Sequence, residues 1–452
     1  MCICAIPAIS AVKSFLARLG LRNVKDTSER QTPPEIAAIV SDRNLRKYAE
    51  LLRLLYSDPQ RIAWLCQLVD LSELGALLNT VMFSLYNSAG PERREEEALV
   101  LTTIRSVLFS YMEGTTQFDS LLCRNTPISP MLVCYTRRKV PQDYIAAVLS
   151  QRIYKILNYE DLNLEIDPQV VYIQLVQSVE ETTGTVHHPF ARNVTPELAA
   201  ENENVQAIIG PRLKMLDEIV DSFLLTIVEQ LDSVPFGIRW ICKQIRTLVQ
   251  QRFPDASEGS ISSVIGGLFF VRLICPVLQT PQDYLPISGV LAKHPRRSLT
   301  LVSLILQQYG NMPLSVEQQS YMDALAPNIE KNRSRVNRFL NDLCEVGEFD
   351  DSVIEASHSG SCGYPAVPLT HYQQDKASSN SSFNVHVSLN NLFHVHAMAL
   401  KYREAFTPEI DDPLRMLVDE LESVPPLLRP AENRIIELRL NGSLLVTTLQ
   451  SV

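Results

Sequence analysis

The chain has 452 residues, of which 46% are hydrophobic and 20% charged, and its formal net charge is −10. This length and composition suit a globular protein with one large helical domain or two smaller ones. The acidic balance argues against general nucleic-acid binding. The most apolar run, "SVIGGLFFVRLICPVL", is interrupted by Arg272, so we predict no membrane span.

The N-terminal residues 1–34 are expected to form a disordered tail, because "KDTSERQTPPE" is polar and contains proline. The apolar start is followed, not preceded, by positive charges, which is the wrong order for a secretory signal. Lipidation of Cys2 or Cys4 is the alternative to an unmodified tail. The nine cysteines include no CxxC pair, which favours buried thiols in a reducing cytosol.

Helical periodicity dominates from Pro34 onward. Residues 44–56 place Leu45, Tyr48, Leu52 and Leu55 three or four positions apart, which predicts an amphipathic helix. Further helices are expected over 71–87, 91–112, 212–231, 234–253 and 391–406. These patterns predict an all-α fold.

Local signals add helix starts, a strand and a linker. Thr195 before Pro196 and Asp412 before Pro413 are typical of an N-cap followed by proline in the first turn. Alternation in "SFNVHVSL", residues 382–389, indicates the one convincing strand. Residues 357–382 are rich in Ser, Gly and Pro and are expected to be a flexible insertion.

Three segments are basic against the acidic average of the chain. Segment 121–155 carries six basic residues and one acid, Asp143, and segment 236–253 carries four basic residues and no acid. Segment 288–310 adds Lys293, Arg296 and Arg297. Together they could present a basic face to an acidic or phosphate-bearing partner.

The second of these segments has helical spacing. Arg239, Lys243 and Arg246 stand at i, i+4 and i+7, which puts three cations on one face of a helix. A solvated face is one interpretation. The other is an acidic group opposite the stripe, either within the protein or on a partner.

The stretch "IGGLFFVRLICPVL" predicts a central, buried helix. Gly266 and Gly267 would allow a neighbouring element to approach closely, and Pro276 would end or bend the helix. Arg272 lies within this apolar run and needs partners for its charge and five donors. It either reaches the surface along its stem or holds an adjacent loop in place.

This stretch resembles a known family. "FFVRLICPVL" is similar to the F-L-R-F-x-N-P-A signature of Ras GTPase-activating domains, with Cys275 at the usual Asn position. "TVMFSLYN" resembles the T-x-x-x-x-L-Y-N element near the start of that domain. "RNVTPELAAENENVQ", "VPFGIRWICKQIRTLVQQRFPDASE" and "DDPLRMLVDELESVP" resemble the IQGAP-related branch, which includes fungal Ras regulators. The resemblance covers residues 40–425.

The resemblance implies a mechanism in which an arginine, the arginine finger, is inserted from a loop into the active site of a Ras-type GTPase. Arg272 occupies the family position that supports this loop. Family loops read L-F/L-R-x-N-S/T, and alignment on Asn125 and Thr126 places Cys123 in the finger position, with Arg124 one residue later. Either Arg124 acts as a displaced finger, or the finger is lost and the domain only binds a GTPase.

Further residues are expected to contact the partner. "VCYTRRKVPQDYI" resembles a segment of fungal Ras activators, and Leu304 stands where the family has a lysine on the GTPase-binding surface. The groove would be lined by segments 121–139, 236–252 and 288–307. The predicted partner-binding residues are Cys123, Asn125, Thr126, Arg137, Arg138, Arg239, Lys243, Arg246, Pro276, Arg296, Arg297 and Leu304.

The family resemblance also implies a domain division. Residues 35–345 would form the helical domain, with 91–309 as the central subdomain and 35–90 together with 310–345 as an extra subdomain. Residues 346–382 would be a flexible linker, and 383–452 a helical extension that packs on the extra subdomain.

The implied function is activation of a Ras-family small GTPase in its GTP form. An inactive IQGAP-like binder of a Rho- or Ras-type GTPase is the first alternative, and a helical scaffold with a different partner is the second. We expect no cofactor of the protein's own, since GTP and Mg²⁺ belong to the GTPase. We also expect no metal site at His386, His394 and His396, and a cytoplasmic location in which the partner recruits the protein to the inner face of the plasma membrane.

Overall fold

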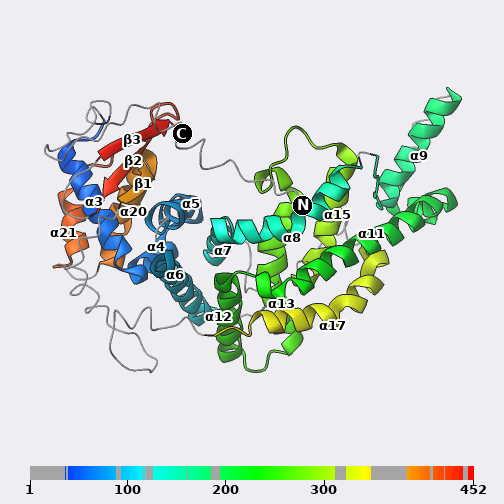
Figure 1. Ribbon diagram of the computed structural model, residues 1–452, viewed down its shortest axis with the longest axis horizontal. Helices are drawn as coiled ribbons and strands as arrows, with labels where there is room; N and C mark the ends of the chain where they lie inside the picture. Colours follow the sequence, from blue (N-terminus) through cyan, green and yellow to red (C-terminus); the bar gives the residue numbers. More distant parts are fainter. Residues whose placement is uncertain are drawn as a thin grey trace, which may run out of the picture.

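The computed structural model of the chain describes residues 36, 39–87, 93–115, 118, 126–159, 161–184, 194–310, 322–347, 384–407, 411–421, 423–440 and 446–451. These residues form two lobes side by side along the long axis, which we call the extra lobe and the central lobe (Figure 1). Helices dominate both lobes, so the predicted all-α fold class is confirmed. The predicted tail 1–34 and most of the predicted linker 346–382 lie outside the described residues.

The extra lobe joins both ends of the chain. Its N-terminal part consists of α3 (Asp42–Tyr56), α4 (Pro59–Leu68), α5 (Leu71–Thr80) and the π-helix η1 (Val81–Leu85), which continues α5. Its C-terminal part includes α20 (Leu389–Phe406), which packs on α4 and α5, and α21 (Pro413–Glu420), which packs on α3. Leu45, Tyr48, Leu52 and Leu55 are all buried, as the periodicity of α3 predicts.

A small antiparallel sheet completes the extra lobe. Its strands lie in the order β1 (Asn384–Ser388), β2 (Arg434–Arg439) and β3 (Val446–Ser451), and Val385 pairs with Leu438. β1 lies within the strand predicted over 382–389. The other two strands differ from the helical extension predicted for 383–452. In β2 the buried Ile436 and Leu438 alternate with Glu437 and Arg439, which is the pattern of a half-buried strand.

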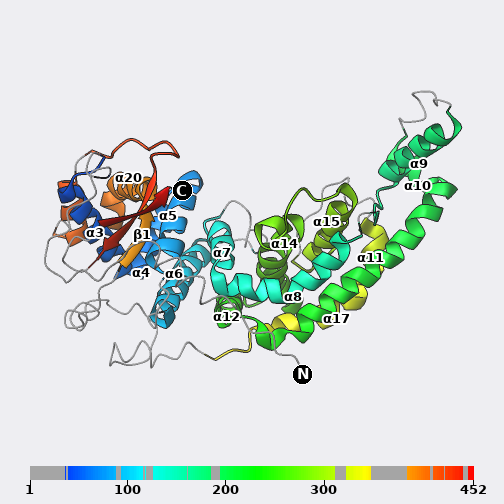
Figure 2. The ribbon, with the colours of Figure 1, turned by 45° about the horizontal axis from the view of Figure 1, so that its top comes forward.

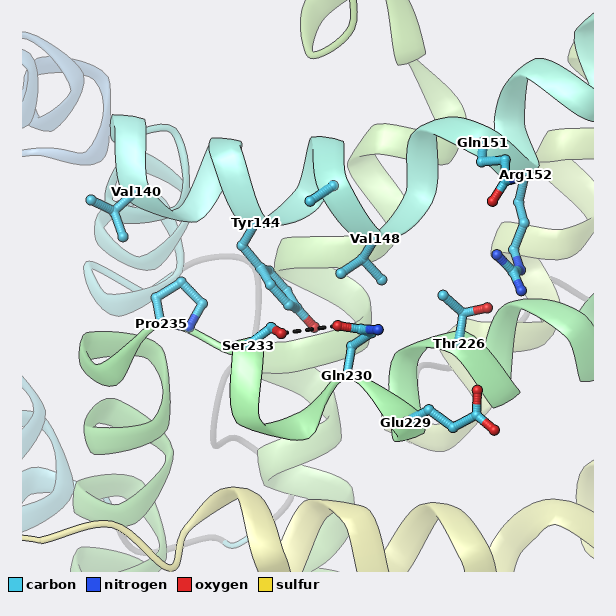
Figure 3. Close-up of a pocket in the computed structure, with 11 residues that line it drawn as sticks. Val140, Tyr144, Val148, Gln151, Arg152, Thr226, Glu229, Gln230, Ser233 and Pro235 are labelled. Atoms are coloured by element: carbon cyan, nitrogen blue, oxygen red, sulfur yellow. Dashed lines mark hydrogen bonds between the residues drawn. The ribbon is translucent and has the colours of Figure 1, made fainter. Parts of the chain in front are cut away.

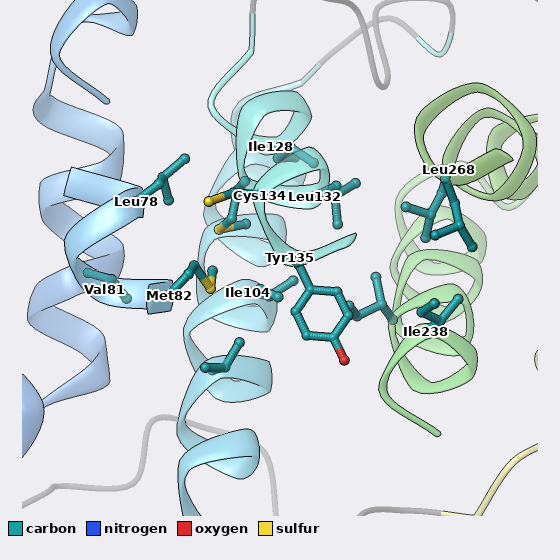
Figure 4. Close-up of a cluster of buried hydrophobic side chains, with 14 of the residues drawn as sticks. Leu78, Val81, Met82, Ile104, Ile128, Leu132, Cys134, Tyr135, Ile238 and Leu268 are labelled. Atoms are coloured by element: carbon teal, nitrogen blue, oxygen red, sulfur yellow. The ribbon is translucent and has the colours of Figure 1, made fainter. Parts of the chain in front are cut away.

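Helix α6 (Arg93–Gly114) connects the lobes, since it packs on α4 in the extra lobe and on α12 (Phe236–Arg252) in the central lobe. Beside it, α7 (Ile128–Thr136) lies between the end of α5 and the central helices (Figure 4). Buried side chains from both lobes meet around α7, including Leu78, Met82, Leu132, Ile238 and Leu268. The apolar core is therefore continuous from one lobe to the other.

The centre of the second lobe is one long apolar helical stretch. It runs through α13 (Glu258–Gly266), the π-helix η5 (Gly267–Ile274) and α14 (Cys275–Gln279). By length and composition residues 258–279 could span a membrane, but 83% of the apolar window is buried inside the protein, as in a core helix. A Cβ atom on Gly266 would lie 2.3 Å from the carbonyl oxygen of Tyr309, so glycine permits the predicted close approach.

The remaining elements of the central lobe surround this stretch. They are α8 (Lys139–Leu157), α15 (Lys293–Gln307), α17 (Ala326–Leu343) and the short helices η4 (Leu231–Ser233), η6 (Pro281–Asp283), η7 (Gln308–Gly310) and η8 (Asp323–Leu325). α17 packs on α11 (Glu203–Glu229), α12 and α13. This packing differs from the predicted grouping of residues 310–345 with 35–90.

A helical arm extends from the far end of the central lobe (Figure 2). It contains α9 (Pro168–Thr183), α10 (Pro196–Glu201) and the first half of α11 (Glu203–Glu229). Thr195 accepts a hydrogen bond from the backbone N–H of Leu198, which confirms the predicted cap of α10. The cap of α21 is confirmed as well, because Asp412 accepts from the N–H of Leu414.

Candidate functional site

Arg272 lies in the core of the central lobe, with 5% of its surface exposed. Its Nε donates to the hydroxyl of Ser129 at 3.0 Å, and its Nη1 donates to the carbonyl oxygen of Gly267 at 2.6 Å. The arginine therefore does not reach the surface. Of the two interpretations of the sequence, internal anchoring is the one that fits these contacts.

The contact with Ser129 identifies what Arg272 anchors. Ser129 is in the first turn of α7, and its backbone N–H donates to the carbonyl oxygen of Thr126. Both Thr126 and Ser129 are buried. Cys123, Arg124 and Asn125 lie outside the described residues. Arg272 thus holds the described chain immediately after the segment that carries Arg124, which we call the finger segment.

The cationic stripe of α12 is bound within the protein. Arg239 donates to the carbonyl oxygens of Asp342, Leu343 and Glu345, at 2.8–3.3 Å, and Lys243 donates to that of Val346 at 2.8 Å. These carbonyls lie at the C-terminal end of α17, where the helix dipole is negative. This placement differs from the predicted contact with a GTPase and answers the question left open by the sequence.

The third member of the stripe pairs with acids. Arg246 lies 3.2 Å from a carboxylate oxygen of Glu258 and 3.9 Å from one of Glu345. The predicted groove between segments 121–139, 236–252 and 288–307 is therefore not lined by these three cations.

Arg138 is an internal anchor as well. Its Nη1 donates to the carbonyl oxygens of Met82 and Tyr86, both at 2.7 Å, and its Nη2 lies 3.4 Å from Glu97. This side chain therefore ties the start of α8 to η1 and α6, which differs from the predicted partner contact. Its neighbour Arg137 is exposed.

The predicted residues of α14 and α15 have mixed surroundings. Arg297 forms two hydrogen bonds, at 2.8 and 2.9 Å, with the carboxylate of the buried Glu165, which the sequence reasoning missed. Leu304 is buried in the core, whereas Arg296 is exposed and Pro276 is half-buried. Among these, Arg296 and Pro276 remain available for contact with another molecule.

Cys275, which stands at the family's Asn position, is buried against α15. Its thiol donates to the carbonyl oxygen of Ser303 at 3.4 Å. Burial raises the pKa of Cys275 to about 12, so the thiol is protonated at neutral pH. The cysteine therefore acts as a packed, weakly hydrogen-bonded side chain and not as a nucleophile.

A pocket of about 530 Å³ lies between α8 and the end of α11 (Figure 3). Tyr144 forms part of its lining, and its buried hydroxyl has no hydrogen-bond partner among the residues that the structure describes. Opposite, Ser233 donates to the side-chain oxygen of Gln230 at 2.9 Å. The lining includes none of the residues predicted to form the site.

Metal ligands do not gather among the described residues, where no group of three or more His, Cys, Asp or Glu side chains could hold an ion. His396 is buried in the extra lobe, and its Nδ1 lies 3.1 Å from the hydroxyl of Tyr48. His386 instead lies on β1, 3.9 Å from Glu437.

The anchored segment falls within a region that matches a known family model. Residues 102–311 match the model described as "GTPase-activator protein for Ras-like GTPase". Residues 102–311 are a RasGAP domain. The domain begins within α6 and ends after η7, so it contains Arg272, Ser129 and the Arg297–Glu165 pair.

Relatives of the RasGAP domain extend the similarity into the extra lobe. The chain is 28% identical to Ras GTPase-activating-like protein rgaA of Dictyostelium discoideum, over 94% of this chain and 49% of that protein. It is 24% identical to human Ras GTPase-activating-like protein IQGAP3, over 85% of this chain and 23% of that protein. A second Dictyostelium protein, gapA, is 28% identical over 68% of this chain and 36% of its own length. The chain thus spans about half of rgaA and less of the other two.

Proposed function

We propose that this protein binds a Ras-type small GTPase in its GTP-bound form and accelerates its GTP hydrolysis, with Arg124 as the arginine finger. The RasGAP domain and the relatives named as GTPase-activating-like proteins support the class of partner. GTP and Mg²⁺ would come with the GTPase. The proposed location is the cytoplasm, with recruitment to the plasma membrane through the partner.

The chemistry requires a guanidinium at a fixed position. Negative charge is spread over the phosphoryl oxygens as the bond to the leaving group breaks, and a planar guanidinium can contact two oxygens at once. For Ras with its activating proteins, the established example, the inserted arginine contributes a factor of about 10³–10⁵ in rate. A cysteine at the same place supplies no charge, which makes Arg124 the candidate in this segment.

One observation carries the proposal. The buried Arg272 donates to Ser129, five positions after Arg124, at 3.0 Å. A charge assists a reaction only where it is held close to the reacting groups. An anchored α7 provides a fixed base for the segment that precedes it.

The second candidate function is GTPase binding without activation. It is favoured by Cys123 in the usual finger position and by the burial of Leu304, which stands where the family has a lysine. A protein of this type would hold the partner in its GTP state. A helical scaffold with a different partner is the remaining alternative.

Single-turnover GTP hydrolysis by purified Ras, with and without this protein, tests the proposal. We expect acceleration by the wild type, a loss of at least about 100-fold in Arg124→Ala and little rescue in Arg124→Lys. Binding of GTP-loaded Ras to Arg124→Ala should persist. The double substitution Cys123→Arg with Arg124→Ala moves the guanidinium to the usual family position and serves as the matched comparison.

The outcomes separate the three functions. Full acceleration by Arg124→Ala would exclude the displaced finger. The inactive binder would be favoured if the protein binds Ras or a Rho-type GTPase only in the GTP-bound form and accelerates GTP hydrolysis by neither. Absence of any nucleotide-dependent binding would favour the scaffold.

A further inference from the structure

The chain that precedes the finger segment is also anchored, from a different helix. α6 ends at Gly114, and the next residue, Thr115, is buried with 7% of its surface exposed. Arg252, the last residue of α12, donates from its Nε to the carbonyl oxygen of Thr115 at 3.0 Å. The hydroxyl of Thr115 donates to the carbonyl oxygen of Tyr111 at 2.8 Å.

An aromatic contact lies three residues further along. The ring of Phe118 packs edge-to-face on the ring of Phe253, with centroids 5.5 Å apart and an interplanar angle of 82°. The guanidinium of Arg252 lies 5.9 Å from the centroid of the same Phe253 ring. Both aromatic rings pack against the central core. Arg252 and Phe253 therefore contact two successive points of the chain after α6.

The physical basis is the end of a helix. The last carbonyl groups of α6 have no partner within the helix and carry the negative end of its dipole. A guanidinium there satisfies a carbonyl and opposes the partial charge. Since Phe253 is followed by Pro254, the backbone that carries these two side chains has limited freedom.

We propose that Arg252 and Phe253 are positioning residues, which fix the incoming side of the segment that carries Arg124. Arg272 fixes the outgoing side through Ser129. Thr115 before this segment and Ser129 after it are thus held by side chains of two different helices. This inference rests on the proposed activation of a GTPase and identifies further residues that would support it.

The same helix provides a matched control. Arg239, near the start of α12, also donates to helix-end carbonyls, but those of α17. Arg239→Ala and Arg252→Ala therefore remove the same type of contact from the two ends of one helix. Only the second contact adjoins the finger segment.

The first experiment measures kcat and KM for the stimulated hydrolysis of GTP-loaded Ras. We expect Arg252→Ala and Phe253→Leu to lower kcat about tenfold with KM nearly unchanged, because the misplaced arginine stabilises the transition state less well. Arg252→Lys should restore most of kcat, since its ammonium can still donate to the carbonyl of Thr115. Arg239→Ala should keep the wild-type kcat.

The second measurement does not depend on activity. Hydrogen exchange of the amides in 116–125 should be several-fold faster in Arg252→Ala than in the wild type and unchanged in Arg239→Ala. If wild-type protein does not stimulate Ras, the proposed function fails, while the exchange rates still decide whether Arg252 anchors the segment.

Three results would overturn the inference. One is an unchanged kcat together with unchanged exchange in Arg252→Ala. Another is an equal fall in kcat in Arg239→Ala, which would indicate a general loss of structure. The third is a raised KM at constant kcat in Arg252→Ala, which would make Arg252 a partner contact.

Discussion

The two lobes each bury one basic side chain in the part of the chain that the structure describes, and they use it differently. In the central lobe, Arg272 is 5% exposed and donates to Ser129 on α7 and to Gly267 in its own helix, η5. In the extra lobe, His396 is 1% exposed, its Nδ1 lies beside the hydroxyl of Tyr48, and its buried Nε2 has no hydrogen-bond partner within the described ranges.

The difference shows how charge and burial are reconciled. Arginine cannot lose its proton, so its burial requires acceptors, and these determine which helices it joins. Histidine can be buried as a neutral ring. Burial lowers the pKa of His396, which favours that neutral form. A buried arginine therefore stays charged and links the helices that supply its acceptors. A buried histidine stays neutral, and protein stability falls when the pH is low enough to protonate it.

The largest expected effect is that of Arg272→Ala. It leaves a cavity and removes the donors to Ser129 and Gly267, so the free energy of unfolding should fall by about 3 kcal/mol. Chemical denaturation measures this. In Arg272→Met, which keeps most of the volume, stability should largely return but stimulated GTP hydrolysis should not. If Arg272→Ala has the same free energy of unfolding as the exposed-site variant Arg296→Ala, the contact between Arg272 and α7 does not stabilise the fold.

A smaller effect is expected at the surface of the central lobe. Arg239→Ala removes hydrogen bonds from a half-buried guanidinium to the end of α17, so the free energy of unfolding should fall by about 1 kcal/mol. Thermal or denaturant unfolding can detect this, with Arg137→Ala as the exposed control. A loss as large as that of Arg272→Ala would remove the contrast between buried and surface arginines.

The smallest effect concerns His396 and appears only as a dependence on pH. Because its pKa is lowered in the folded protein, the unfolded chain binds the extra proton as pH falls below the ordinary histidine value of about 6.5. Stability should therefore decline from pH 7 towards pH 5.5, and less steeply in His396→Asn. Denaturant titrations across this range test it, and parallel pH profiles for the two proteins would contradict it.

The sequence predicts the core better than the surface. The helical periods, the caps at Thr195 and Asp412 and the central apolar helix follow from local patterns, and the structure agrees with each. The interpretation of Arg272 as an internal anchor is also possible from sequence, because an arginine in an all-apolar run must find acceptors. The family resemblance further indicates that Arg272 anchors the loop that carries the finger.

What could not be predicted depends on contacts between distant segments. Arg239 and Lys243 of α12 have the spacing of a binding face, but their acceptors are carbonyls at the end of α17, about a hundred positions later. The sequence around Glu165 does not indicate that its carboxylate accepts hydrogen bonds from Arg297. In the extra lobe, β2 pairs with β1, about fifty positions earlier in the chain, and no local pattern reveals that contact.

The position of Arg138 has a practical consequence for the size of the independently folding unit. Its guanidinium donates to the carbonyl oxygens of Met82 and Tyr86, which precede residues 102–311, the range that matches the family. A fragment trimmed to the matched range would lose both acceptors, together with the side chains of Leu78 and Met82 that cover α7. The shortest fragment that folds stably should therefore include α5 and η1, although the range that matches the family begins only at residue 102.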